Sequence, residues 1–197
     1  MRILIIGASG HVGSAAMDVL SREHEVVGVS RSTSPAVDLR NQDSISQLFV
    51  QLGKFDAVIS AFGAAPFKST SALDADDYTA AFTGKVLSQL NLVRIGRDYV
   101  NDGGSFTLIT GILAREPIPT GAAAAMANGA VEAFVMAASG EMPRGIRLNA
   151  VSPTVLEAAT AYHRTFAGFE PVASEIVGQA FLRSIEGIAN GRVYKLD

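Results

Sequence analysis

Short apolar runs alternate with amphipathic stretches along the whole 197-residue chain. The runs are bounded by glycine, proline or polar residues, which is typical of strands buried on both faces of a sheet. Between the runs, apolar residues recur at helical spacing. Strands followed regularly by helices favour right-handed crossovers and a doubly wound parallel sheet, an α/β fold. We expect seven parallel strands, at residues 2–6, 25–29, 36–37, 57–60, 105–109, 146–149 and 193–196.

The helical segments have recognisable ends. Asp43 is the predicted cap of a helix that Gly53 closes, and Pro171 is predicted to open the last helix. The long helical stretch 74–102 is expected to break near Gly84. Residues 121–140 are mostly small and apolar, but they include Asn128 and Glu132 and contain alanine in place of leucine. This segment therefore predicts a buried or interface helix and not a membrane span.

Composition narrows the class of protein. Hydrophobic residues make up 48% and charged residues 18%, which indicates a folded globular chain. The net charge is −3, so the chain lacks the excess of basic residues that is typical of proteins that bind nucleic acid. There is no cysteine, hence no disulfide and no thiolate site for zinc, and the three histidines lack metal-ligand spacing. We expect a cytoplasmic protein with neither a nucleic-acid nor a membrane partner and with no metal.

The first predicted strand runs directly into three glycines and then a helix. Gly7, Gly10 and Gly13 follow at three-residue spacing. A turn without side chains lets a pyrophosphate approach the backbone, and the helix N-terminus presents unpaired N–H groups and a positive dipole end. This context predicts a Rossmann-type domain over residues 1–197 that binds a dinucleotide, with Ser9, His11 and Val12 also beside the phosphates.

The end of the second strand bears on the choice of cofactor. An acid there would bind the ribose hydroxyls of NAD, whereas an arginine accommodates the 2′-phosphate of NADP. The chain has Ser30-Arg31-Ser32 and no acid, so we expect NADP in preference to NAD, bound by Arg31 and Ser32. The simpler alternative is that Arg31 is a solvated loop residue.

Four segments resemble the short-chain dehydrogenase/reductase family. Residues 7–13 resemble its glycine motif in the shorter-spaced variant, residues 37–39 its acidic position beside the adenine, and residues 60–63 its Asn-Asn-Ala-Gly. The most specific match is Pro-Arg-Gly-Ile-Arg-Leu-Asn-Ala-Val-Ser-Pro at 143–153. The resemblance, which is to a compact subgroup, implies further cofactor contacts from Asp38, Leu39, Ser60, Ala61, Gly63, Asn128, Pro153 and Val155.

The chain departs from the family at the catalytic positions. The family uses a tyrosine as proton donor, a lysine four residues later and a serine after the fifth strand. Here the tyrosine position falls on or near Ala124, the lysine position on Asn128, and the serine position on Thr110 or Gly111. An asparagine that the family carries on the preceding helix falls at or beside Lys85. The usual acid is therefore absent.

Other side chains are candidates for the role of the missing tyrosine, which is to donate a proton. Thr110 could supply a hydroxyl to a carbonyl oxygen, and Lys85 could serve as a cation or proton relay. Tyr162 and His163, in the loop after Pro153, could donate a proton if that loop closes over substrate. The alternatives are that Lys85 is a surface or ribose-contacting lysine and that Tyr162 and His163 are ordinary loop residues.

Three functions stay open at this point. The favoured one is an NADP-dependent oxidoreductase that transfers hydride between the cofactor and a small carbonyl or alcohol. The second is a catalytically inactive NADP-binding protein with a regulatory or structural role, because a fold does not imply an activity. The third is an epimerase or isomerase. The resemblance also implies a homodimer or homotetramer through the helices at 85–101 and 122–138, unless the alanines only pack on their own sheet.

Overall fold

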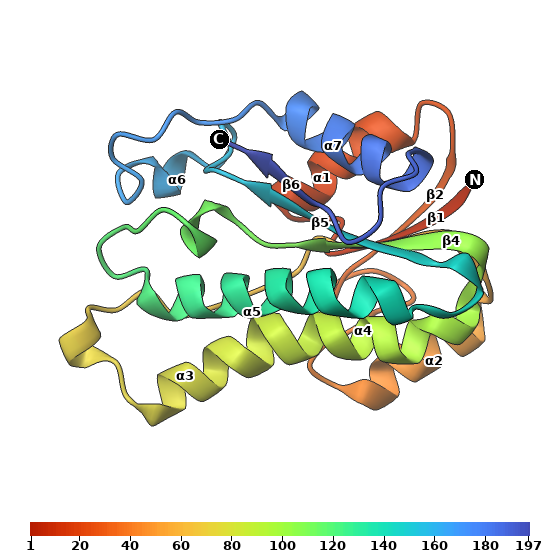
Figure 1. Ribbon diagram of the computed structural model, residues 1–197, viewed down its shortest axis with the longest axis horizontal. Coiled ribbons are helices and arrows are strands. Elements are labelled where there is room, and N and C mark those ends of the chain that lie inside the picture. The colour runs from red at the N-terminus through yellow and green to blue at the C-terminus, as the bar shows by residue number, and fades with distance from the viewer.

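Six parallel strands form one sheet in the computed structural model, which describes residues 1–197 (Figure 1). Their order across the sheet is β2-β1-β3-β4-β5-β6. The order reverses between β1 and β3, and in such sheets ligands bind outside the carboxyl ends of the strands at this point. The strands are β1 (Arg2–Ile6), β2 (Glu25–Val29), β3 (Phe55–Ser60), β4 (Val100–Ile109), β5 (Arg147–Pro153) and β6 (Val193–Leu196).

The prediction of a doubly wound parallel sheet is confirmed, but the seventh strand is wrong. Residues 36–37 form no strand, and the Val37 amide instead donates to the carbonyl of Ser30 at 3.0 Å. A parallel neighbour needs a crossover of about a dozen residues or more, which 30–35 cannot supply. Val37 and Leu39 are buried all the same, because they cover the core beside the edge strand β2.

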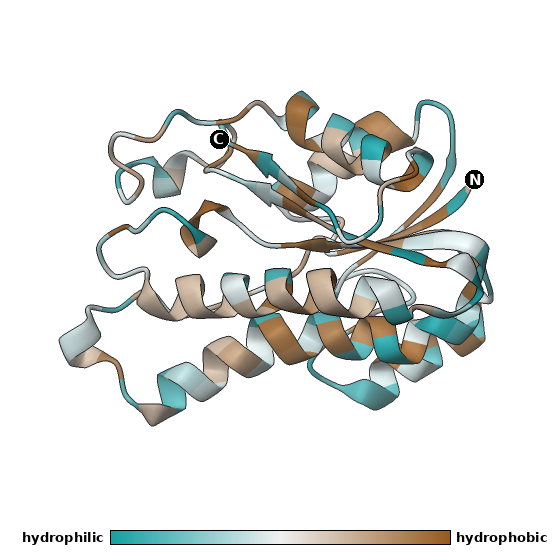
Figure 2. Cartoon of the chain, in the orientation of Figure 1, coloured by the Kyte–Doolittle hydropathy of each residue, from teal (hydrophilic) through white to brown (hydrophobic).

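Helices cover both faces of the sheet, and alternate residues of β1 show how (Figure 1). Ile3 and Ile5 belong to the apolar cluster under α1 and α7, whereas Leu4 and Ile6 belong to the larger cluster on the other face. Hydrophilic residues gather in the loops and on outer helix surfaces (Figure 2). The helices are α1 (His11–Leu20), α2 (Gln42–Leu52), α3 (Ala75–Ala81), α4 (Ser88–Gly96), α5 (Ala122–Ala138), α6 (Thr160–His163) and α7 (Ser174–Glu186).

Helix α5 is the alanine-rich segment of the sequence. The stretch Ala122–Glu141 has a mean hydropathy of 1.3, so it is long and apolar enough to cross a membrane by length and composition alone. A helix in the core of a folded protein meets the same criterion. In this structure Ala127, Val131 and Val135 are fully buried in the larger apolar cluster. The interpretation of this segment as a helix packed on the sheet fits that arrangement.

Several predicted boundaries differ from those observed. Asn41, not Asp43, caps α2, since its side chain accepts from the amides of Asp43 and Ser44. Pro171 does not open α7, because Val172 forms an isolated bridge with Leu156 and the helix begins at Ser174. The stretch 74–102 contains α3, the π-helical turns Phe82–Leu87 and α4, and it ends where β4 begins at Val100.

A buried glutamine side chain hydrogen-bonds to the backbone of β4 beyond the end of β3. The side chain of Gln89, on α4, is fully buried, and its amide donates to the carbonyl of Ile109 at 2.9 Å. Its carbonyl oxygen accepts from the amide of Ile109, also at 2.9 Å. These two bonds pair the backbone of β4 at a position that β3 no longer reaches. Gln89 therefore supports the end of β4 that precedes Thr110.

Replacing Gln89 with leucine should destabilise the protein. The side-chain volume is nearly kept, but two buried backbone groups lose their partners, at about 1–3 kcal/mol each, so we expect a loss of roughly 2–6 kcal/mol. Urea unfolding followed by circular dichroism measures this loss. The control is Gln179→Leu on the exposed side of α7, which should stay within about 0.5 kcal/mol. Equal effects of the two substitutions would contradict the role given to Gln89.

Candidate functional site

The turn between β1 and α1 depends on close backbone contacts. Gly7 has φ of +88°, and a Cβ there would lie 2.8 Å from the carbonyl oxygen of Ala61. A Cβ on Gly13 would overlap the carbonyl oxygen of Gly7. Gly10 occupies the N-cap of α1, where no side chain caps the helix. The first amides of α1 are thus left for a ligand, as the sequence predicts for an anion site.

A cleft of about 500 Å³ lies beside this turn, between the ends of β1, β2 and β3. A second cleft of about 440 Å³ continues from it toward β4 and β5 and shares Gly10, Ala61 and Gly63 with the first. The predicted cofactor residues in the first cleft are Gly7, Ser9, Gly10, Arg31, Ser32, Asp38, Leu39, Ala61 and Gly63. Those that line the second are Gly10, His11, Val12, Ala61, Gly63, Asn128, Pro153 and Val155.

Two of the predicted cofactor residues line neither cleft. Gly13 lies beneath the turn, where only glycine fits, and Ser60 is fully buried at the end of β3. The catalytic candidates Thr110, Lys85 and Tyr162 all line the second cleft. His163 does not, and its Nε2 lies 3.0 Å from the carbonyl oxygen of Leu156. The fold thus brings together three of the four side chains that the sequence singles out for catalysis.

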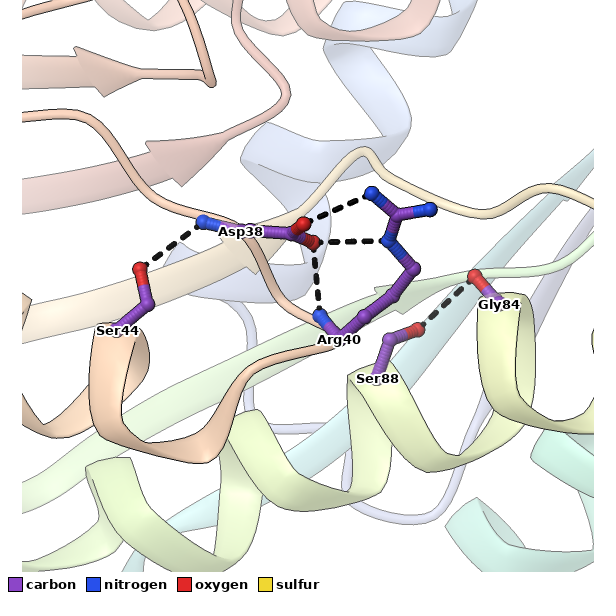
Figure 3. A network of polar contacts seen from close by, with 5 residues as sticks. All are labelled: Asp38, Arg40, Ser44, Gly84 and Ser88. Carbon is purple, nitrogen blue, oxygen red and sulfur yellow. Dashed lines mark hydrogen bonds and ion pairs between the residues drawn. The ribbon is translucent and has the colours of Figure 1, made fainter.

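Asp38, which lines the first cleft, is held by Arg40 (Figure 3). Arg40 Nε donates to Oδ1 at 3.0 Å and Nη2 to Oδ2 at 2.8 Å, and the Arg40 amide also donates to Oδ1. The hydrogen bonds from Arg40 lower the pKa of Asp38, and the charge of Arg31 acts in the same direction. The Asp38 amide in turn donates to Ser44 Oγ at the start of α2. Asp38 is therefore a fixed anion in the wall of the cleft.

The π-helical turns Phe82–Leu87 bring Lys85 to the second cleft. The carbonyl of Gly84 accepts from Ser88 Oγ at 3.2 Å (Figure 3). It also accepts from the Ala64 amide at 3.3 Å. A Cβ on Gly84 would lie 2.8 Å from the Ala64 carbonyl oxygen, so glycine permits this contact. The Lys85 side chain passes over Gly63, within 3.2 Å of where a Cβ would stand. Single π-turns inside helices occur frequently at functional sites.

The ammonium of Lys85 has no partner. It forms no ion pair, and its surroundings lower the pKa to about 8. The main cause is burial, which penalises the charged form, and the nearby charge of Glu132 opposes it. A group with a pKa near 8 can both donate and accept a proton close to neutral pH. Lys85 thus meets the chemical requirement for proton transfer in this cleft.

Thr110 is not free in the way that the sequence suggests. Its Oγ1 donates to Glu132 Oε1 at 2.8 Å, so its proton points away from the cleft. Glu132, which accepts this proton, is not among the candidate residues that the sequence suggests for the site. Its signal was available, because it lies one helical turn after Asn128 and two turns after Ala124, on the same face of α5.

Two polar atoms in the second cleft are buried without partners, namely Asn128 Oδ1 and Thr154 Oγ1. Both residues are about 5% exposed or less. Buried polar groups are almost always hydrogen-bonded, so orphaned atoms in a cleft indicate a ligand or ordered water. The hydroxyl groups of a nucleoside ribose are donors of the kind that Asn128 Oδ1 needs. The cleft therefore fits a polyhydroxylated ligand.

A glycine turn at a helix N-terminus, and a two-part cleft across the switch point of a parallel sheet, define the class of Rossmann-fold dinucleotide-binding proteins. The model of the family described as enoyl-(acyl carrier protein) reductase matches residues 13–193. The chain belongs to the short-chain dehydrogenase/reductase family, whose members use nicotinamide dinucleotides. The resemblance seen in the sequence is confirmed.

Individual relatives agree with this assignment. The crystal structure of the protein lin1944 from Listeria innocua superposes with a TM-score of 0.97 and 45% identity, covering all of both chains. An uncharacterized oxidoreductase of Methylorubrum extorquens is 24% identical over 185 residues, which is 92% of this chain and 74% of the relative. A small-chain dehydrogenase in complex with NADPH shares the fold, with a TM-score of 0.88 and 24% identity over 100% of this chain and 96% of the other.

The lowered pKa of Lys85 can be tested by the pH dependence of its acetylation. We expect acetylation of Lys85 by acetic anhydride, followed by mass spectrometry as a function of pH, to show a midpoint of about 8. Burial is the physical reason, since it favours the neutral amine that reacts. Exposed Lys54 provides the comparison within the same sample. A Lys85 midpoint at or above that of Lys54 would contradict the described environment.

Proposed function

We propose that this protein is an NADP-dependent oxidoreductase that interconverts a small carbonyl compound and its alcohol, with Lys85 as the proton donor in reduction. The observation that carries the proposal is the unpaired Lys85 ammonium in the cleft, with its pKa lowered to about 8. It lines the same cleft as Ala124, which stands on or near the family's tyrosine position. Membership of the family and the two-part cleft at the switch point of the sheet also support the proposal.

The cofactor half of the proposal rests on the first cleft. The amides at the start of α1 would hold the pyrophosphate, and Arg31 with Ser32 would hold the 2′-phosphate of NADP. Arg31 forms no ion pair with an acidic side chain, so its guanidinium is available to a phosphate. Asn128 Oδ1 would accept from a ribose hydroxyl. The NADPH complex of a protein with the same fold supports this choice of cofactor.

The outer wall of the second cleft supports a small, uncharged substrate with an apolar group. It is built largely from apolar side chains: Ala65, Phe67, Ile112, Leu113, Ala124, Leu156, Ala159, Tyr162 and Phe166. Apart from His11, Lys85 is the only basic residue in this lining, so no arginine is present to bind a carboxylate. The carbonyl oxygen is the polar part of such a substrate, and Lys85 is the group that would meet it.

The proposed chemistry divides between cofactor and protein. When bound, the nicotinamide supplies the hydride for reduction and accepts it in oxidation. The Lys85 N–H proton goes to the carbonyl oxygen, which leaves a neutral amine that takes up another proton from water. Thr110 contributes no proton to substrate while it donates to Glu132. Tyr162, 52% exposed at the rim, would cover the substrate and exclude water.

The surface around helices α4 and α5 has features that favour binding of a second copy of the chain. A groove of about 420 Å³ runs between them and is lined by Leu87, Leu90 and Phe134 among others. Leu87 and Met136 are apolar and exposed, Met136 to 71%. We propose that these helices bind a second copy of the chain, giving a homodimer or a homotetramer. Members of the family typically oligomerise.

A cofactor-binding protein without catalysis is the second candidate. The replacement of the family's tyrosine and lysine by Ala124 and Asn128 is the observation that favours it. Such a protein would bind NADPH and turn nothing over. Activity measurements separate the two candidates directly.

Nucleotide binding is tested by thermal shift. NADPH should raise the melting temperature more than NADH, because a ligand that binds only the folded state stabilises it by mass action. Arg31→Asp should abolish the preference, since a charge-assisted bond to phosphate contributes about 1.5–3 kcal/mol, or roughly a tenfold to hundredfold change in Kd. The control is Arg164→Asp, an exposed arginine that lines neither cleft. Absence of a shift with every nucleotide would contradict both candidates.

Catalysis is tested with NADPH and a panel of small uncharged ketones and aldehydes. Lys85→Met keeps most of the stem and removes the donor, so kcat/KM should fall by roughly 10²–10⁴-fold. In the unsubstituted protein the reduction rate should fall as the pH rises through about 8, because the neutral amine has no proton to give. Lys54→Met on the exposed surface is the control. NADPH binding without turnover of any compound would favour the inactive candidate.

A further inference from the structure

Glu132 is the charged residue behind the wall of the second cleft. Its Oε1 accepts from Thr110 Oγ1 at 2.8 Å and from Ser152 Oγ at 2.9 Å. Thr110 directly follows β4 and Ser152 lies near the end of β5, and these strands are neighbours in the sheet. One carboxylate oxygen of α5 thus ties together the two strand ends that carry the cleft.

The direction of each proton in this cluster is determined by its partners. Arg115 Nη1 donates to Ser152 Oγ at 2.8 Å, and Arg115 also pairs with the carboxylate of Asp197. Because Ser152 accepts from a guanidinium, its own proton goes to Glu132, and so does that of Thr110. The shared oxygen receives two donors, so it carries no proton itself. The charge of Glu132 favours the ammonium form of Lys85.

We propose that Glu132 is a positioning residue for Lys85: its carboxylate holds the ends of β4 and β5 against α5 and supplies the negative charge that stabilises the Lys85 ammonium in the cleft. Glu132 does not line the cleft and so would not touch substrate. The proposal rests on the role given to Lys85 in the proposed function. Burying part of a carboxylate costs solvation energy that an apolar side chain would not cost, which argues for a role beyond packing.

The other groups around Lys85 leave Glu132 as the source of negative charge. On the β1–α1 side the titratable group is His11, and on the loop after β5 it is Tyr162. From β4 and α5, Thr110 and Asn128 face the cleft and carry no charge. The loop after β3 presents Gly63 and other uncharged residues. Glu132 is also the one residue whose charge raises the pKa of Lys85.

Two substitutions separate the charge of Glu132 from its hydrogen bonds. In Glu132→Gln the amide oxygen still accepts from both hydroxyls, but the negative charge is lost. In Thr110→Val the charge stays and one bond is lost. Glu141→Gln, just beyond the end of α5 and exposed, removes the same charge elsewhere and serves as the control.

The first measurement is the acetylation midpoint of Lys85, taken without cofactor or substrate. Glu132→Gln should lower this midpoint by about one pH unit, because the ammonium loses the opposite charge that favoured it. Thr110→Val and Glu141→Gln should leave it unchanged. A Glu132→Gln protein that melts like the parent and keeps the parent midpoint would overturn the proposal.

The second measurement is the pH profile of NADPH-dependent carbonyl reduction. The alkaline fall in rate should move to lower pH in Glu132→Gln and parallel the labelling midpoint, a change that a purely structural role would not produce. A moved midpoint in a protein that reduces no carbonyl compound supports the pairing of Glu132 with Lys85 and overturns the oxidoreductase. An unmoved midpoint in an active enzyme overturns the pairing alone.

Discussion

Close contact between backbones is the constraint on which the rest of the structure depends. Gly7 lies against Ala61 at the end of β3, and Gly13 lies under the carbonyl of Gly7, so α1 begins directly over the switch point of the sheet. The same contact brings the ends of β1 and β3 together, and the two clefts meet there at Gly10, Ala61 and Gly63. A side chain at Gly7 or Gly13 would push these segments apart, and the shared wall of the clefts would be lost.

The second cleft, toward β4, β5 and α5, depends on a different set of contacts. The family places its acid on α5, but there this chain has Ala124 and Asn128, and the ionisable group comes from the π-helical turns before α4. Gly84 and Gly63 make this possible, one by letting the turns approach Ala64 and the other by leaving room for the Lys85 side chain. Partial burial and the charge of Glu132 then act on the lysine in opposite directions. The acid role that we propose for Lys85 would thus depend on packing between three separate segments.

Local sequence patterns predicted the helices and strands correctly wherever residues close in sequence decide the structure. The strands at 2–6, 25–29 and 193–196 and the helix at 122–138 lie where periodicity predicts them, because both depend on which residues within one element are apolar. Predictions that needed a partner from elsewhere were less accurate. Whether 36–37 forms a strand depends on an available sheet edge, and whether Asn41 or Asp43 caps α2 depends on where the first turn starts.

The sequence by itself determined the class of protein, the glycine turn and many of the residues that line the two clefts, since these follow from spacing along one segment and from the family's motifs. Tertiary structure alone decided the hydrogen bonding and burial of the polar side chains around the second cleft. Lys85, Thr110 and Glu132 are far apart in the chain, and their roles depend on the direction of one hydroxyl proton and on the burial of one ammonium. Burial and proton direction are properties of the packed arrangement, because each is set by atoms that other segments bring into contact.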